Sequence, residues 1–264
     1  FVSDLHLGDG TGADDFWLES EFLRFLDFAE KEADELIIVG DLFELWQCNL
    51  ERVIFYHSKT INAIISFAKK KKTTYIIGNH DHLPFVKYLD PALSCTENIQ
   101  AAKACPGFRI VLEYGNDGLH AEHGNQFDIF NRYKDPRLAV KNKWGRPTAY
   151  ICGLFERLLH PDFDEWVGMV LRKSRGAYFE AMAFLKNKVA PSTDEYRRRG
   201  GAYDEYVKAA KIFIDEGKKL VVFGHTHKAG LIKFDNGVYA NCGAWSGNVK
   251  PTYVTYEKGK VELR

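Results

Sequence analysis

The chain has 264 residues, of which 45% are hydrophobic and 27% charged, a balance typical of a folded globular protein. Its 36 basic and 36 acidic side chains cancel, so net charge indicates no partner. No run of about 18 apolar residues occurs, so we expect no transmembrane helix. The sequence opens on a strand-like segment and not on a signal peptide, and its five scattered cysteines are typical of reduced thiols. We therefore expect a cytoplasmic protein.

The first half of the chain alternates strands with helices. A short strand around Val2 precedes apolar residues at helical spacing from Phe16 to Ala29, with Asp14 or Asp15 as the expected N-cap. The run Leu36–Val39 predicts a buried strand. A second helix is expected over 50–70, followed by a strand at 75–77. His57 lies on the apolar face of that helix, where a core histidine is favoured over a metal ligand.

The later part of the chain adds strand-like segments separated by turns. Asn236-Gly237 indicates a hairpin turn within this region. The pattern predicts an α/β fold with two packed sheets and helices on the outer faces. The expected strands are 108–112, 119–122, 220–223, 230–234, 238–242, 253–256 and 260–263.

Residues 125–218 interrupt this alternation and form a predicted helical insertion within a single domain, 1–264. Residues 129–200 contain 15 basic against 8 acidic side chains. Because the insertion begins directly after His123, we expect a cap that binds an anionic substrate; a helical excursion that only completes the fold is the alternative. The basic residues placed to meet an anion are Arg132, Lys134, Arg137 and Arg146.

Four short segments end strand-like runs with residue types that ligate metals, and a fifth lies between the last two. Because parallel strands of an open sheet present their carboxyl ends at one edge, we expect these side chains to meet there. Imidazole, carboxylate and amide groups are numerous enough for two metal ions, an arrangement suited to phosphate-ester hydrolysis. The segments are Asp4-Leu5-His6, Gly40-Asp41, Gly78-Asn79-His80-Asp81, His123-Gly124 and Gly224-His225-Thr226-His227.

These five segments, in this order, resemble the calcineurin-like metallophosphoesterases, and the resemblance spans residues 3 to about 243. It implies a four-layer α/β/β/α sandwich. The segment from Gly40 to Trp46 resembles the corresponding segment in the branch of the family that contains UDP-2,3-diacylglucosamine hydrolase, a pyrophosphatase of lipid A synthesis. Two positions depart from that branch, which has arginine in the place of His80 and aspartate in the place of Asn125.

The resemblance also implies a role for each ligand. Asp41 would bridge two ions, with a water between them as the nucleophile. Oxygen and nitrogen ligands without thiolate favour manganese, with iron or zinc as alternatives. One ion would be completed by Asp4, His6 and His227, and the other by Asn79, His123 and His225.

Three further residues are expected to support the reaction. His80 would stabilise the transferring phosphoryl group or protonate the leaving oxygen. Asp81 would either orient His80 or hold the loop. Asn241, at the end of a strand after the last ligands, is expected behind the metal-binding imidazoles.

The function predicted from these features is hydrolysis of a phosphodiester or pyrophosphate bond in a small nucleotide-linked or lipid-linked molecule. The alternatives on the same two-metal site are a nuclease, a cyclic-nucleotide phosphodiesterase and a general phosphomonoesterase. A nucleic-acid partner is disfavoured because net basic charge is absent. A scaffold without activity is disfavoured because every ligand position is filled. The apolar faces of the insertion, 150–159 and 166–171, have three alternative roles: a groove for acyl chains, peripheral contact with the inner membrane face, or packing against each other, which is favoured for any single residue.

Overall fold

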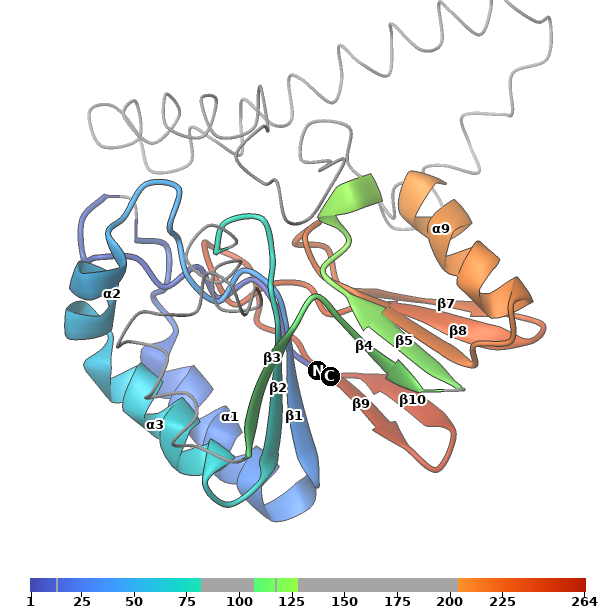
Figure 1. Cartoon of the computed structure of the whole chain (residues 1–264), viewed down its shortest axis with the longest axis horizontal. Coiled ribbons are helices and arrows are strands. Elements are labelled where there is room, and N and C mark those ends of the chain that lie inside the picture. The colour runs from blue at the N-terminus through green and yellow to red at the C-terminus, as the bar shows by residue number, and fades with distance from the viewer. Residues whose placement is uncertain (13, 82–106, 117, 128–203) are drawn as a thin grey trace, which may run out of the picture.

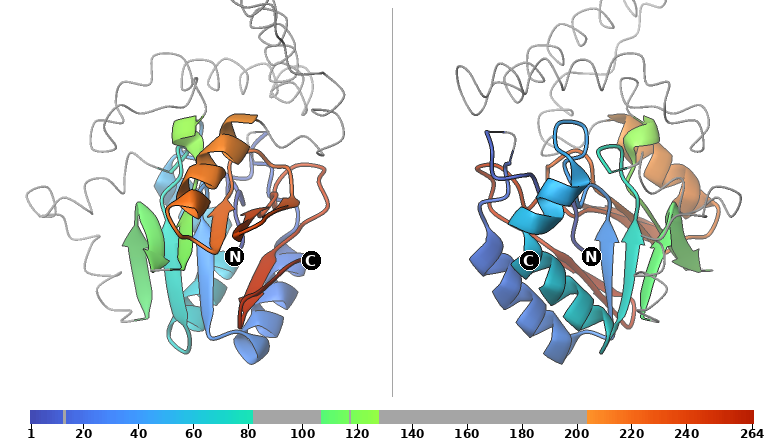
Figure 2. Two further views of the ribbon diagram at one scale, coloured as in Figure 1. Left: turned by 90° about the vertical axis from the view of Figure 1, so that its right-hand side faces the viewer. Right: turned by 60° about the vertical axis from the view of Figure 1, so that its left-hand side comes forward.

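A computed structural model describes residues 1–12, 14–81, 107–116, 118–127 and 204–264 (Figure 1). Two β-sheets pack face to face, and helices cover the outer face of each (Figures 1 and 2). The mixed α/β class expected from the sequence is confirmed.

The first sheet is parallel and has the strand order β1-β2-β3. Its strands are β1 (Glu35–Val39), β2 (Lys72–Ile76) and β3 (Phe108–Val111). The amino-terminal segment joins this sheet through a parallel bridge between Val2 and Ile38. The carboxyl ends of these parallel segments therefore lie at one edge of the molecule.

The helices α1 (Glu19–Glu32), α2 (Leu50–Tyr56) and α3 (Ser58–Ala68) cover the outer face of this sheet. Phe22, Phe25, Leu26 and Ala29 of α1 are buried, and their spacing places them on one face of the helix. They pack in one cluster with Ile38 of β1 and Tyr75 of β2.

The single helix expected over 50–70 is divided at His57. This residue lies between α2 and α3 with φ −96° and ψ 28°. Its imidazole Nε2 lies 2.7 Å from Oδ2 of Asp14, and both side chains are buried. His57 is thus a core histidine, as predicted.

Asp14 is not the N-cap of α1, and neither is Asp15. The helix begins at Glu19, after Leu18, which makes no side-chain capping bond. Asp14 instead accepts hydrogen bonds from the backbone N–H groups of Gly8, Gly10 and Phe16. The loop before α1 supplies these otherwise unsatisfied donors, and they outcompete the helix terminus for the carboxylate.

The second sheet has the order β4-β5-β6-β8-β7, with β5, β6 and β8 parallel and an antiparallel strand at each edge. Phe234 pairs with Gly237, so the tight turn consists of Asp235 and Asn236, one residue before the expected position. The strand β4 was not predicted, because Glu113-Tyr114-Gly115-Asn116 lacks apolar alternation. The strands are β4 (Glu113–Asn116), β5 (Leu119–Glu122), β6 (Leu220–Phe223), β7 (Gly230–Phe234) and β8 (Gly237–Asn241).

A final hairpin, β9 (Val254–Glu257) and β10 (Lys260–Leu263), lies beside the two sheets. Between the sheets, Val39 and Ile76 pack in one apolar cluster with Ala121, Val222 and Ala240. This cluster fixes the two sheets against each other and so sets the position of the strand ends.

The outer face of the second sheet is covered by α9 (Asp204–Asp215), whose Tyr206 and Ala210 pack on Val221 and Phe223. The short 3-10 helix η1 (Asn125–Phe127) contributes Phe127 to the same cluster. Both belong to the ends of the expected insertion 125–218. The rest of it, with Arg132, Lys134, Arg137 and Arg146, lies outside the described residues.

Two cysteines, Cys48 and Cys242, are buried free thiols. Burial raises the pKa of each to about 12, so both stay protonated and unreactive at neutral pH. Across the part of the chain that the structure describes, no helix is long and apolar enough to cross a bilayer.

Candidate metal centre

The predicted ligands follow the carboxyl ends of strands from both sheets. Asp41 lies two residues beyond β1, and Asn79 lies three residues beyond β2. In the second sheet, His123 directly follows β5 and His225 lies two residues beyond β6. Residues far apart in sequence therefore meet at one edge of the molecule.

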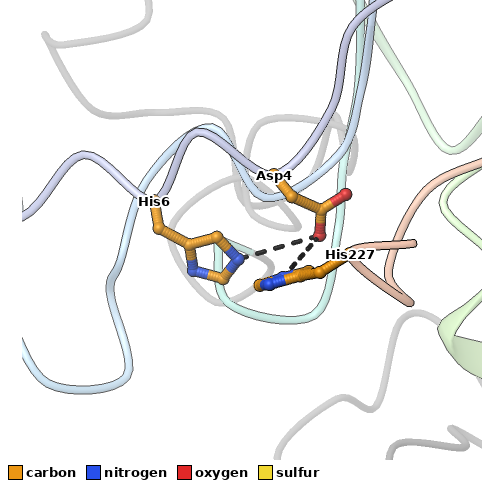
Figure 3. A group of neighbouring side chains, drawn as sticks. All are labelled: Asp4, His6 and His227. Atoms are coloured by element: carbon orange, nitrogen blue, oxygen red, sulfur yellow. Dashed lines mark ion pairs between the residues drawn. The ribbon is translucent and has the colours of Figure 1, made fainter. Parts of the chain in front are cut away.

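Asp4, His6 and His227 form one group of ligand atoms, all within 4.8 Å of one another (Figure 3). The Oδ1 atom of Asp4 lies 3.2 Å from Nε2 of His227 and 3.7 Å from Nε2 of His6. One carboxylate oxygen thus faces two imidazole nitrogens across a space that suits a cation.

Asp41, His123 and His225 form the second group, again with ligand atoms within 4.8 Å. The Nε2 atom of His123 lies 2.9 Å from Oδ2 of Asp41 and 3.1 Å from Oδ1 of Asn79. The other nitrogen of His123, Nδ1, donates a hydrogen bond of 2.8 Å to the carbonyl of Val39. This bond fixes the ring so that Nε2 is the nitrogen available to a metal.

Asp41 lies between the two groups. Its Oδ2 atom is 2.9 Å from His123 in one group and 3.8 Å from His6 in the other. Its Oδ1 atom accepts a hydrogen bond of 2.8 Å from the backbone N–H of His80. Asp41 therefore lies within reach of both groups, and its bridging of two metal ions stays a prediction.

Buried polar atoms in the first group fit a bound cation. Asp4 is fully buried and His6 is 7% exposed. Within the described part of the chain, Oδ1 of Asp4 and Nε2 of His6 make no hydrogen bond. Because buried polar atoms are nearly always satisfied, an additional partner between them is expected, and a divalent cation satisfies both.

Without a bound metal, the close contacts between carboxylates and imidazoles shift the pKa values of both. Burial opposes the charged form of His123, but the carboxylates of Asp41 and Asp4 outweigh it and raise its pKa to about 9. Burial raises the pKa of Asp41, yet the imidazoles of His123 and His80 lower it well below its usual range. The proton on His123 thus occupies a position that a cation would take.

The backbone at this edge adopts conformations that are uncommon outside glycine. Among the described residues, six non-glycine residues have positive φ, and five of them are predicted ligands. The sixth, Lys258, lies between β9 and β10. Clustering of such conformations at one place is typical of a functional site. The five ligands are Asp4, His6, Asp41, His225 and His227, with φ between 47° and 65°.

Two glycines allow the ligand segments to approach closely. A Cβ atom at Gly78 would lie 2.1 Å from Oδ1 of Asp41, and one at Gly40 would lie 2.2 Å from Nδ1 of His123. Gly40 also has φ of 86°. Glycine is therefore required sterically before Asp41 and before Asn79, because a side chain there would clash with the neighbouring ligand segment.

Glu44 was not assigned a role from the sequence, although it belongs to the segment from Gly40 to Trp46. Its buried Oε2 atom lies 3.1 Å from Nδ1 of His6 and 2.5 Å from Nδ1 of His80. The imidazoles of His80 and His6 outweigh burial and lower the pKa of Glu44 to about 2. The signal available in the sequence was a carboxylate close to a ligand, because metal-bound histidines usually donate their second nitrogen to such a group.

The ring of His80 is also held by Trp46. The two rings stack with centroids 4.1 Å apart and an interplanar angle of 18°. The backbone of His80 is held as well, since its carbonyl accepts a hydrogen bond of 3.2 Å from Leu45. His80 is therefore fixed beside the expected metal ligands through its ring and its main chain.

Asp81 holds the loops of the site together. Its carboxylate accepts hydrogen bonds from the backbone of Gly78 at 2.9 Å and Leu42 at 3.0 Å, and from the hydroxyl of Tyr75. Burial and the nearby charge of Asp41 raise the pKa of Asp81 to about 7. These contacts correspond to the loop-holding role, one of the two expected for it.

Asn241 supports a ligand through the main chain. Its side-chain amide donates a hydrogen bond of 2.8 Å to the carbonyl of Gly224, which directly precedes His225. Its Oδ1 atom accepts a hydrogen bond of 3.0 Å from Gly243. Asn241 thus lies behind the ligands, as expected, but fixes their backbone.

Residues 1–229 match the family model of the calcineurin-like phosphoesterases. The chain belongs to this family, which confirms the resemblance drawn from the five segments.

Curated relatives at modest identity carry the name UDP-2,3-diacylglucosamine hydrolase. The protein of Ralstonia nicotianae is 27% identical over 232 residues, covering 88% of this chain and 77% of the relative. That of Psychromonas ingrahamii is 23% identical over 270 residues, covering 100% of this chain and 95% of the relative. That of Blochmanniella pennsylvanica is 27% identical over 135 residues, so the match spans half of this chain and 51% of the relative.

Proposed function

We propose that this chain is a metal-dependent hydrolase of a phosphodiester or pyrophosphate bond. The observation that carries the proposal is the position of Asp41, whose Oδ2 atom faces His123 at 2.9 Å and His6 at 3.8 Å. Two ligand groups that share one carboxylate suit a pair of cations held side by side.

The residues present fit such a pair, and we propose manganese as the cation. When bound, two divalent cations supply charge neutralisation for the phosphoryl oxygens and an acidified water. Asp4, His6 and His227 would hold one cation, and Asn79, His123 and His225 would hold the other, with Asp41 shared. The hydrogen bond from His123 to Val39 and the contact of His6 with Glu44 keep both rings in the ligating orientation.

His80 is proposed as the general acid. Its Nδ1 atom is engaged by Glu44, which leaves Nε2 as the nitrogen that can deliver a proton to the leaving oxygen. The contact with Glu44 fixes which edge of the imidazole faces away from it, and stacking on Trp46 fixes the plane of the ring. Proton transfer of this kind typically contributes about 10²–10⁴-fold in rate.

For the substrate, we propose a nucleotide-linked and lipid-linked pyrophosphate of the UDP-2,3-diacylglucosamine type. The names of the relatives support this choice. The basic residues expected in the insertion would meet the anionic part of such a molecule, and its acyl chains suit a cytoplasmic protein that contacts the inner membrane face. The imidazole of His80, in the place of an arginine, makes other phosphodiesters the main competitors.

The test is an assay of the full chain, loaded with manganese, on a panel of phosphoesters. The panel contains UDP-2,3-diacylglucosamine, a cyclic nucleotide, single-stranded DNA, bis-p-nitrophenyl phosphate and p-nitrophenyl phosphate. We expect metal-dependent turnover, highest on the UDP-linked lipid, and none in Asp41→Asn. Turnover of every diester except the lipid would reject the substrate, and no turnover of any panel member would reject the activity.

A further inference from the structure

A second group of metal-ligating side chains lies on the hairpin of β4 and β5, apart from the centre described above. Glu113 of β4 pairs directly opposite Glu122 of β5. His120 and Glu122 are two residues apart on one strand, so their side chains share a face of the sheet. Ligand atoms of Glu113, His120 and Glu122 all lie within 4.8 Å of one another.

Two of these side chains are buried with polar atoms that lack hydrogen bonds. His120 is 8% exposed and Glu122 is 7% exposed. The Nε2 atom of His120 and the Oε1 atom of Glu122 lie 3.2 Å apart, yet neither makes a hydrogen bond within the described residues. Buried polar atoms of native proteins rarely stay in this condition, so a shared partner is expected between them.

Neighbouring residues hold both donors in place. The imidazole of His120 stacks on Phe213 of α9, with ring centroids 4.0 Å apart and an interplanar angle of 19°. The other oxygen of Glu122, Oε2, accepts a hydrogen bond from the side chain of Gln126. These contacts hold both side chains so that Nε2 of His120 and Oε1 of Glu122 face each other.

The spacing of the two donors suits a cation. Donor atoms held roughly 2.1 Å from one cation in tetrahedral geometry lie about 3.4 Å from each other. The Nε2 atom of His120 and the Oε1 atom of Glu122 lie 3.2 Å apart, close to this separation. Two carboxylates also balance the charge of a divalent ion.

The surroundings leave room for further ligands. Gly115 stands opposite His120 and presents no side chain there. A cavity of about 320 Å³ borders the group and is lined in part by Glu113, Gly115 and His120. Lys218 also lines it, but its ammonium group donates to the carbonyl of Asn116 at 2.7 Å. Water can therefore reach the cation and complete its shell.

We propose that Glu113, His120 and Glu122 form a third divalent-cation site, selective for zinc or manganese. One imidazole and two carboxylates are ligands that both ions accept. The ion would fasten the edge strand β4 to β5 and stabilise the end of β5, from which His123 follows directly. Its role would be structural, because its ligands belong to neither of the two groups of the main centre.

The test counts bound ions in the full chain by mass spectrometry after dialysis against zinc or manganese. Glu113→Gln is the first variant, because Glu113 is exposed and the change should not disturb folding. The exposed Glu257, on β9, gives the control Glu257→Gln. We expect Glu113→Gln and Glu113→Gln/His120→Gln to bind one ion fewer than the parent chain, and Glu257→Gln to bind the same number.

Repeating the count in Asp41→Asn separates this site from the main centre. One ion per chain should remain in Asp41→Asn, and adding Glu113→Gln should remove it. Metal at about 100 times its Kd should raise the Tm of Asp41→Asn by roughly 5–10 °C, and Glu113→Gln should abolish the rise. Equal ion counts in the Glu113 and Glu257 variants with both metals, or a rise in Tm that survives Glu113→Gln, would overturn the proposal.

Discussion

The Nδ1 atom of His80 lies 2.5 Å from Oε2 of Glu44, and the same oxygen lies 3.1 Å from Nδ1 of the expected metal ligand His6. One buried carboxylate therefore orients both a ligand and the proposed general acid. Glu44 is therefore a positioning residue. It acts on metal binding through His6 and on turnover through His80, and the two effects can be measured separately.

Replacing Glu44 by glutamine keeps its size and removes its charge. We expect kcat to fall by about 10–100-fold, because groups that orient metal-bound histidines commonly have effects of this size. Metal affinity should fall as well, because the same carboxylate orients the expected ligand His6. Steady-state kinetics together with metal titrations test both effects, with exposed Glu32→Gln on α1 as the control. A kcat and a metal affinity like those of the control would contradict the role of Glu44.

His80→Ala should retain both metals and lose turnover by about 10²–10⁴-fold. Its ring neighbours the ligand His6, with centroids 4.6 Å apart, but it is not needed to hold a cation. Asp41→Asn should lose metal as well as turnover, because its carboxylate serves both ligand groups. Metal content measured alongside kinetics distinguishes the two variants. Normal turnover by His80→Ala would remove its assigned role.

Gly78→Ala should disrupt the metal centre through a steric clash. The new methyl group would lie 2.1 Å from Oδ1 of Asp41, so the carboxylate or its loop must shift. We expect weaker metal binding and a loss of kcat of at least about tenfold, since small misplacements of a catalytic group are costly. Gly230→Ala is the matched control, because a methyl group there meets nothing within 4 Å. Equal metal affinity in the two variants would show that the site tolerates the shift.

Metal affinity should rise with pH. The pKa of His123 is raised to about 9 in the folded metal-free chain, so its imidazole carries a proton at neutral pH that a metal must displace. The proton stabilises the metal-free fold fully below about pH 6.5 and this contribution is lost as the pH rises through about 9. The carboxylates of Asp4 and Glu44 outweigh burial and also raise the pKa of His6, so manganese affinity should increase by at least about tenfold per pH unit across this window and then level off. Chelator competition between pH 6.5 and 9.5 measures this, and a flat profile would contradict it.

The meeting of the expected ligands at one edge was predictable because four of the five segments follow short strand-like runs. The supporting residues were harder to predict, since their partners are distant in sequence. Asp14 looked like a helix cap, but the backbone N–H groups of Gly8 and Gly10 and the side chain of His57 claim its carboxylate. Local pattern cannot show such competition between partners.

The strand β4 and the role of Glu44 were missed for related reasons. β4 is polar and carries a glycine, so its pairing with β5 depends on the neighbouring strand more than on its own sequence. Glu44 lies within the segment from Gly40 to Trp46 that carries the resemblance, but its role depends on contacts of one of its oxygens with both His6 and His80. Tertiary contacts decide both.

Left-handed backbone conformations should affect how quickly the protein is degraded in a cell. They occur at the five expected ligands Asp4, His6, Asp41, His225 and His227. Each such conformation costs of order 1–3 kcal/mol, and a bound cation offsets it only when present. The metal-starved chain should therefore open locally at this edge and become a substrate for proteases, whereas the loaded chain resists them. We expect the amount of folded protein to follow the supply of metal as well as its rate of synthesis.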